Sequence, residues 1–129
     1  MDDTRFGGFN LEKAREFLRN KKKHKQASID RRFQKAWNDF ERITAMIWKT
    51  YKPRAIYQWG SLLNRDRFSD ISDIDIALAG DIPAEAFFEM YGKAIEMTKL
   101  PLDIIELDKI NPLHAQSIRE KGRVVYGRE

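Results

Sequence analysis

The chain has 129 residues, a net charge of +4 and no cysteine, and 34% of its residues are charged. This length fits one domain with a substantial core, and the lack of cysteine excludes a disulfide framework and a thiolate zinc site. No apolar run approaches the length of a membrane span, so we expect a soluble, cytoplasmic protein with no membrane partner.

The charge is unevenly distributed along the chain. Residues 1–54 hold 15 Lys and Arg against 7 Asp and Glu, whereas residues 55–129 hold 9 against 13. In the basic part, one helix is expected after Asn10, a good N-cap residue, and another over residues 28–51, where apolar side chains recur every three or four positions. The basic run 19–25 between them has no apolar stripe, so we expect a solvated helix end or linker there and no nucleic-acid partner.

The rest of the chain alternates between strand and helix patterns. Strands are predicted at 55–59, 73–79, 102–107 and 124–126, and helices at 61–65, 83–95 and 112–121. This order predicts an α/β fold preceded by N-terminal helices. We treat residues 1–129 as a single domain, with a helical part at 1–52 that starts with a loose segment at 1–9, and an α/β core at 53–129.

Two aspartates on the second predicted strand are the most informative residues. Asp73 and Asp75 alternate with Ile74 and Ile76, so both carboxylates lie on one face of the strand while the isoleucines face a core. Two carboxylates one pleat apart repel each other unless a cation lies between them. The pattern therefore indicates half of a metal site.

Gly60, Ser61 and Asp103 extend this pattern. A glycine after a strand lets the backbone approach a phosphate, and the Ser61 hydroxyl can donate to a phosphate oxygen. Because Mg²⁺ prefers a few carboxylate oxygens together with substrate phosphate oxygens, the Gly-Ser pair and the two aspartates favour a site for nucleotide phosphates and magnesium. Asp103 lies in an otherwise apolar strand, where a carboxylate is costly unless it has a partner or a function. It is therefore the candidate for the third carboxylate of the metal site.

These motifs resemble the DNA polymerase β-type nucleotidyltransferase superfamily. The resemblance rests on Trp59-Gly60-Ser61, on Ser72-Asp73-Ile74-Asp75 and on Asp103, and it covers about residues 54–126. Within the superfamily, the small size is similar to that of the minimal nucleotidyltransferases (MNT), which are often encoded beside HEPN ribonuclease toxins. The spacer between Ser61 and Asp73 has eleven residues, where ten is usual, and residues 62–67 replace the common Arg-Ala-Arg-Gly stretch.

The resemblance implies a small mixed sheet with helices packed on one face. It implies that two Mg²⁺ ions are bound by three catalytic aspartates, Asp73, Asp75 and Asp103. It also implies that Asp103 helps to deprotonate the attacking hydroxyl. Gly60 and Ser61 would hold the triphosphate of ATP, assisted by Arg65 or Arg67. The implied activity is transfer of AMP from ATP to a tyrosine of a HEPN toxin partner, which would make the protein an antitoxin.

Two alternatives stay open at this point. One is a non-catalytic binding module that neutralises its partner by occlusion, for which the aromatic-rich helix over residues 29–51 is a candidate interface. The other is nucleotidyl transfer to a small molecule, which would require a substrate domain supplied by a partner chain. Both alternatives are compatible with a protein that forms oligomers.

Overall fold

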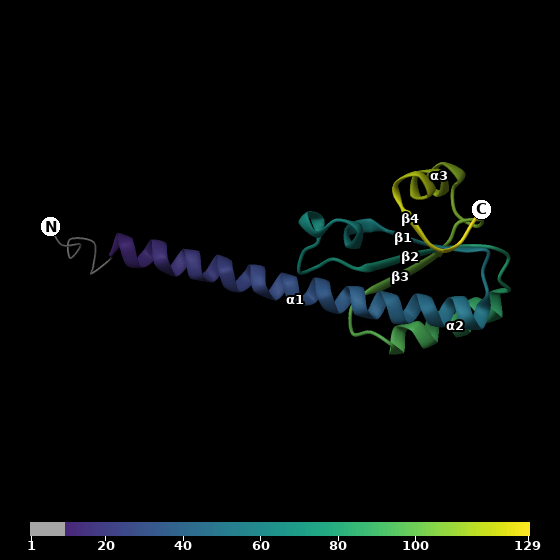
Figure 1. Cartoon of the computed structure of the whole chain (residues 1–129), viewed down its shortest axis with the longest axis horizontal. Helices are drawn as coiled ribbons and strands as arrows, with labels where there is room; N and C mark the ends of the chain where they lie inside the picture. Colours follow the sequence, from purple (N-terminus) through teal and green to yellow (C-terminus); the bar gives the residue numbers. More distant parts are fainter. Residues whose placement is uncertain (1–9) are drawn as a thin grey trace.

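The computed structural model describes residues 10–129, and the loose segment expected at 1–9 lies outside them. The described chain forms a sheet with helices packed against it (Figure 1). The elements are α1 (Leu11–Tyr51), β1 (Ala55–Trp59), η2 (Gly60–Leu63), η3 (Arg65–Arg67), β2 (Ile74–Ala79), α2 (Ala84–Glu96), β3 (Leu102–Glu106), α3 (Pro112–Lys121) and β4 (Arg123–Gly127). No helix within residues 10–129 is both long and apolar enough to span a membrane.

α1 is one continuous helix of 41 residues, so the prediction of two separate helices is wrong. The run 19–25 is part of this helix because it contains neither glycine nor proline, and Lys and Arg favour the helical state. All of its side chains are exposed. Asn10 caps the helix as predicted: its side-chain oxygen accepts a hydrogen bond of 3.1 Å from the backbone N–H of Lys13.

The sheet is mixed, as predicted. Its strand order is β3-β2-β1-β4, with β2 parallel to β3 and both other pairs antiparallel. The parallel pair is joined by the α2 crossover, since parallel neighbours need a long connection. Strand β2, which carries the Asp-x-Asp motif, therefore lies in the middle of the sheet, next to the strand that carries Asp103.

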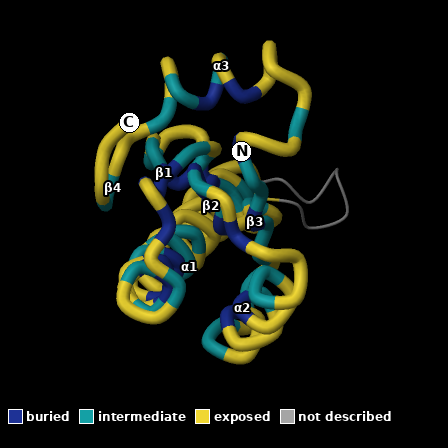
Figure 2. The backbone as a smooth tube through the Cα atoms, turned by 90° about the vertical axis from the view of Figure 1, so that its right-hand side faces the viewer, coloured by how far each residue is buried: buried dark blue, intermediate teal, exposed yellow. Residues whose placement is uncertain are grey.

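The two faces of the sheet are covered differently. On one face, Ile74, Ile76 and Leu78 of β2 belong to a core cluster that includes residues of α1 and α2, whereas Ala115 and Ile118 of α3 pack on the other. Figure 2 shows α3 across the sheet from α1 and α2. Helix α3 is thus the exception to the expected packing of helices on one face, and it shares its face with the Asp-x-Asp side chains.

Asp39 connects α1 to the segment after α2. Its side chain is 1% exposed and accepts hydrogen bonds from Lys35 (3.0 Å), Arg42 (2.9 Å) and Thr98 (2.7 Å). Burial raises the pKa of the Asp39 carboxyl, but the hydrogen bonds from Thr98, Arg42 and Lys35 outweigh burial and leave that pKa below its ordinary value. The ionised carboxylate therefore stabilises the docking of α2 on α1.

We expect Asp39→Ala to lower the free energy of unfolding by about 1–3 kcal/mol at neutral pH, because Thr98, Arg42 and Lys35 lose the carboxylate that accepts their hydrogen bonds. A carboxyl whose pKa falls on folding contributes stability above its unfolded pKa and loses that contribution as pH falls through the folded value. Urea unfolding from about pH 7 to about pH 3 should show the wild-type and variant stabilities converging as the pH falls. A difference that stays constant over this range would contradict the assignment.

Candidate active site

Asp75 and Asp103 lie directly opposite each other on neighbouring strands. They are register partners in the parallel β2–β3 pair, and Trp59 is the partner of Asp75 in the antiparallel β1–β2 pair. Neighbouring strands are about 4.8 Å apart, so the two carboxylates are within direct electrostatic reach of each other. By strand alternation, Asp75 lies on the same face as Ala77, which packs in the cluster that includes α3.

The third aspartate, Asp73, lies just before β2, since the strand begins at Ile74 rather than at residue 73 as expected. Asp73 is exposed, whereas Asp75 and Asp103 are half-buried. Burial, then the negative charge of Asp103 and then that of Asp73 raise the pKa of Asp75 to about 6. The structure therefore brings the three predicted aspartates within electrostatic range of one another.

The donor chemistry of this cluster is compatible with Mg²⁺. Within residues 10–129, no three His, Cys, Asp or Glu side chains form a metal-ligand group on their own. A protein Mg²⁺ site does not need one, because the ion commonly takes one or two carboxylates and completes its octahedron with waters and substrate phosphate oxygens. Asp75 and Asp103 supply that number, and a cation beside them would offset the repulsion that raises the pKa of Asp75.

Gly60 is required where it stands. Its φ of +81° lies in the left-handed region, and a Cβ at this position would collide with the Asp75 carboxylate. The absence of a side chain thus lets the start of η2 approach the aspartate closely, as expected for a backbone that meets a phosphate. The backbone at Gly60 and the Asp75 carboxylate can therefore lie this close only because residue 60 has no side chain.

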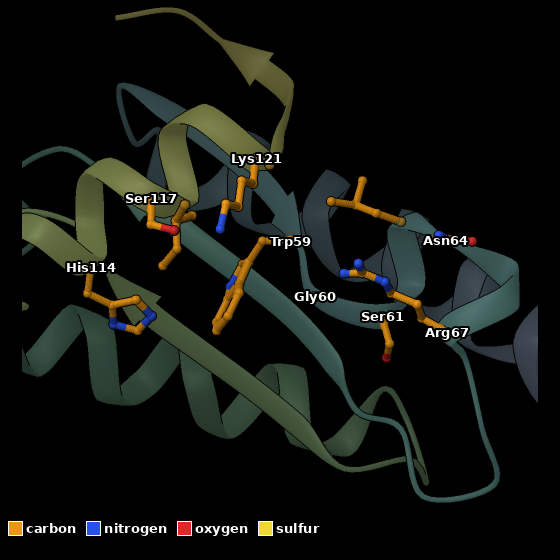
Figure 3. A pocket seen from close by; sticks show the side chains of 11 residues that line it. Trp59, Gly60, Ser61, Asn64, Arg67, His114, Ser117 and Lys121 are labelled. Carbon is orange, nitrogen blue, oxygen red and sulfur yellow. The ribbon is translucent and has the colours of Figure 1, made fainter.

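A cavity of about 600 Å³ opens beside Gly60. One wall comes from the segment after β1 and the other from α3, which crosses this face of the sheet (Figure 3). The residues labelled in Figure 3 that line it are Trp59, Gly60, Ser61, Asn64, Arg67, His114, Ser117 and Lys121. Its volume and its position next to the aspartates suit a nucleotide.

Two cationic side chains belong to the wall of this cavity. Arg67 of η3 and Lys121 of α3 line it from different elements (Figure 3), and neither forms an ion pair with any residue from 10 to 129. Arg65, the arginine named first from the sequence, instead hydrogen-bonds Asp30 of α1 at 2.9 Å and lies 5.5 Å from the ring centre of Phe33. Of the two arginines considered, Arg67 is therefore the one that reaches the cavity.

Sequence reasoning missed the residues contributed by α3 and by the end of β1. The rings of Trp59 and His114 meet edge to face at 5.8 Å on the cavity wall. The Trp59 indole N–H is buried without a hydrogen-bond partner among the described residues. The spacing of His114, Ser117 and Lys121 on one helix face is the signal that could have identified this wall.

Comparisons with known proteins identify the family and the fold. The family model described as "Polymerase beta, Nucleotidyltransferase" matches residues 41–129. Among curated protein sequences, none matches the chain.

Three solved structures have a similar fold. A toxin–antitoxin MntA–HepT structure is 20% identical over 71% of this chain and 73% of that chain, with a TM-score of 0.54. A toxin–antitoxin structure with AMP-PNP is 22% identical over 69% and 74%, with a TM-score of 0.56. A complex of tri-AMPylated Shewanella oneidensis HEPN toxin with MNT antitoxin is 20% identical over 72% and 73%, with a TM-score of 0.54. At these identities the likeness is one of fold.

Proposed function

The chain belongs to the polymerase beta nucleotidyltransferase family, and on that premise we propose that it is an antitoxin that transfers AMP from ATP to a tyrosine hydroxyl of a HEPN toxin. The observation that carries the proposal is the Asp75–Asp103 pair beside the Gly60 bend and its cavity. The acceptor is suggested by fold neighbours, one a complex with a tri-AMPylated HEPN toxin and another a toxin–antitoxin structure with AMP-PNP.

In the proposed reaction, the acceptor oxygen forms a bond to the α-phosphorus of ATP while the bond from that phosphorus to the pyrophosphate oxygen breaks. Asp75, Asp103 and Asp73 would hold Mg²⁺, which, when bound, neutralises charge that develops on the phosphate oxygens. Asp103, the register partner of Asp75, would accept the proton that the acceptor hydroxyl loses. Positioning and charge stabilisation supply most of the catalysis, because phosphoryl transfer needs little covalent help from the protein.

The cavity residues would bind the nucleotide. The backbone at Gly60 and the hydroxyl of Ser61 can donate to phosphate oxygens, and Arg67 and Lys121 bring positive charge to the same space. Trp59 offers an aromatic wall to the nucleoside. The cations that line the cavity and the aspartate that Gly60 approaches together match a substrate that consists of a metal-bound triphosphate.

We expect Arg67→Ala and Lys121→Ala each to raise the KM for ATP by about tenfold with a smaller change in kcat, because each removes a charge-assisted contact to the triphosphate. Arg65→Ala is the matched comparison. Its guanidinium is already bound by Asp30, so a smaller change in KM is expected. Initial rates over a range of ATP concentrations measure both constants. A larger rise in KM for Arg65→Ala than for Arg67→Ala would indicate that Arg65, and not Arg67, contacts the triphosphate.

The proposed function is tested by intact-mass measurement of a HEPN partner produced together with this chain. A mass increase of one or more AMP groups, located on tyrosine and absent when Asp75 is changed to Asn, supports transfer. An unmodified partner in a stable complex would support neutralisation by occlusion. Consumption of ATP with AMP found only on a small molecule would support the remaining alternative.

A further inference from the structure

The first half of α1 extends beyond the rest of the domain (Figure 1). We call residues 11–28 the projecting helix; apart from the half-buried Ala14, all of its residues are exposed, and it lies outside the family match. Leu11, Phe17 and Leu18 are 50%, 66% and 61% exposed. Leu11 lies five helical turns from Ile29 and ten from the buried Ile47, and Leu18 lies about two turns from Leu11, so the two leucines continue the core-facing side of α1. Phe17 lies beside this line, about a third of a turn around the helix.

No residue from 10 to 129 covers the apolar stripe of Leu11, Phe17 and Leu18. Isolated helices are marginal in water, and most helix stability in proteins comes from packing of an apolar face. Two leucines and a phenylalanine on a solvated helix therefore indicate a surface that is covered by a partner.

α2 carries a second exposed apolar stripe. Phe88 and Ile95, seven residues apart, are 72% and 55% exposed, and Ala84 and Gly92 lie on the same side. A Cβ at Gly92 would meet nothing within 4 Å, so the domain itself does not require glycine there. Glycine inside a helix is less favourable than alanine, and a close approach by another backbone is a reason to accept that cost.

The charges around the two stripes are complementary. The projecting helix holds seven Lys and Arg against two Glu, whereas α2 holds three Glu against one Lys. Glu85 and Glu96 of α2 form no ion pair within residues 10–129, and the same is true of Lys22 on the projecting helix. A basic apolar helix and an acidic apolar helix thus occur on one chain, and no residue from 10 to 129 covers the exposed stripe of either.

We propose that the projecting helix of one copy packs on the exposed face of α2 in a second copy, forming a two-fold symmetric dimer. The arrangement follows from how α2 lies along α1. Arg42 donates to the carbonyl of Met97 at 2.7 Å and Tyr51 donates to Glu89 at 2.7 Å, so α2 runs antiparallel to the C-terminal half of α1. In the dimer, the α1 helices of the two copies cross in antiparallel orientation near residue 30. Each projecting helix then lies beside the α2 helix of the other copy. One symmetry operation forms both contacts.

A nucleic-acid partner fits these features less well. The basic residues of the run 19–25 fall on several sides of the helix rather than on one face. Phosphate binding would leave Leu11, Phe17 and Leu18 without a partner and would not involve the stripe on α2. The dimer accounts for both stripes and for both signs of charge.

Sedimentation and light scattering on the full chain test the proposal. We expect a wild-type mass of twice 15.2 kDa, and a dimer dissociation constant at least about tenfold weaker in Leu18→Glu and in Phe88→Glu, since each buries a charge at an apolar anchor. Both side chains are exposed in one copy, so circular dichroism should show unchanged folding. Leu113→Glu is the matched control: Leu113 is 77% exposed on α3, outside both stripes, and this variant should stay dimeric.

Charge reversal gives a second test that does not depend on lost packing. A copy with Glu85→Lys and Glu96→Lys, and another with Arg15→Glu and Lys22→Glu, should each be monomeric alone and should form a dimer when mixed, because mixing pairs opposite charges at both contacts. Four results would overturn the proposal: a monomeric wild type, a dimer unaffected by Phe88→Glu, reversed copies that do not associate, or a monomer whose projecting helix binds a DNA or RNA duplex in a salt-dependent way.

Discussion

Asp75→Asn is expected to abolish AMP transfer while making the metal-free domain more stable at neutral pH. The activity loss should reach about three orders of magnitude, equivalent to several kcal/mol of transition-state stabilisation, because the variant removes a proposed Mg²⁺ ligand. The stability gain follows from the pKa of Asp75, which is raised to about 6 by burial and by Asp103 and Asp73. Transfer of labelled AMP to the HEPN partner and chemical unfolding in a chelator measure the two effects.

The sign of the stability effect depends on pH. A carboxyl whose pKa rises on folding destabilises the fold when it is ionised, so its cost appears as pH rises from the ordinary value of 3.8 through about 6. The neutral amide of the variant avoids this cost. We therefore expect the variant and the wild type to differ little near about pH 4 and by about 1–3 kcal/mol near about pH 8. A variant that is less stable than the wild type at both values would contradict the raised pKa assigned to Asp75.

Asp70→Asn is the matched control for this substitution. Asp70 is an exposed carboxylate in the loop before β2 and forms no ion pair within the described residues. Its amide variant should transfer AMP like the wild type. Added Mg²⁺ should raise the melting temperature of the wild type and of Asp70→Asn, and should have little effect on Asp75→Asn, because ligand binding stabilises only a fold that can bind the ion.

The sequence predicted the parts of the site that depend on the geometry of a single strand. Alternation along β2 places Ile74 and Ile76 in the core and Asp75 on the other face, and the structure confirms both placements. The pairing of Asp75 with Asp103 depends on a parallel register between strands 22 residues apart in the sequence, which alternation does not determine. The pairing could be anticipated only on two grounds. A carboxylate within an apolar strand is costly unless it has a partner or a function, and a known family has the same arrangement.

The parts that sequence did not predict depend on tertiary packing. Whether α3 covers the face of Asp75 or the opposite face decides whether Lys121 reaches the cavity, and both faces of the sheet are apolar enough to accept a helix. The choice between Arg65 and Arg67 depends on the path of η3 beside α1. The continuity of α1 was missed because a run without an apolar stripe was interpreted as a break, although helix propensity alone can carry a solvated segment.

Gly60→Ala should lower kcat by about a hundredfold or more, because an added Cβ must displace the Asp75 carboxylate and also occupies a left-handed backbone position. It should also lower the free energy of unfolding by about 1–2 kcal/mol. Gly92→Ala is the matched control, since a Cβ at Gly92 meets nothing within 4 Å. This control should transfer AMP at the wild-type rate.

A double-mutant cycle then separates two roles for Gly60. If the glycine acts by positioning the Asp75 carboxylate, Gly60→Ala should cost little further activity once Asp75 is already Asn, because the group that it positions no longer binds the ion. If the glycine acts by letting its own backbone N–H reach the triphosphate, the two losses should multiply and the KM for ATP should rise in both backgrounds. Because an added Cβ would strike the Asp75 side chain rather than a neighbouring backbone, we expect the first result.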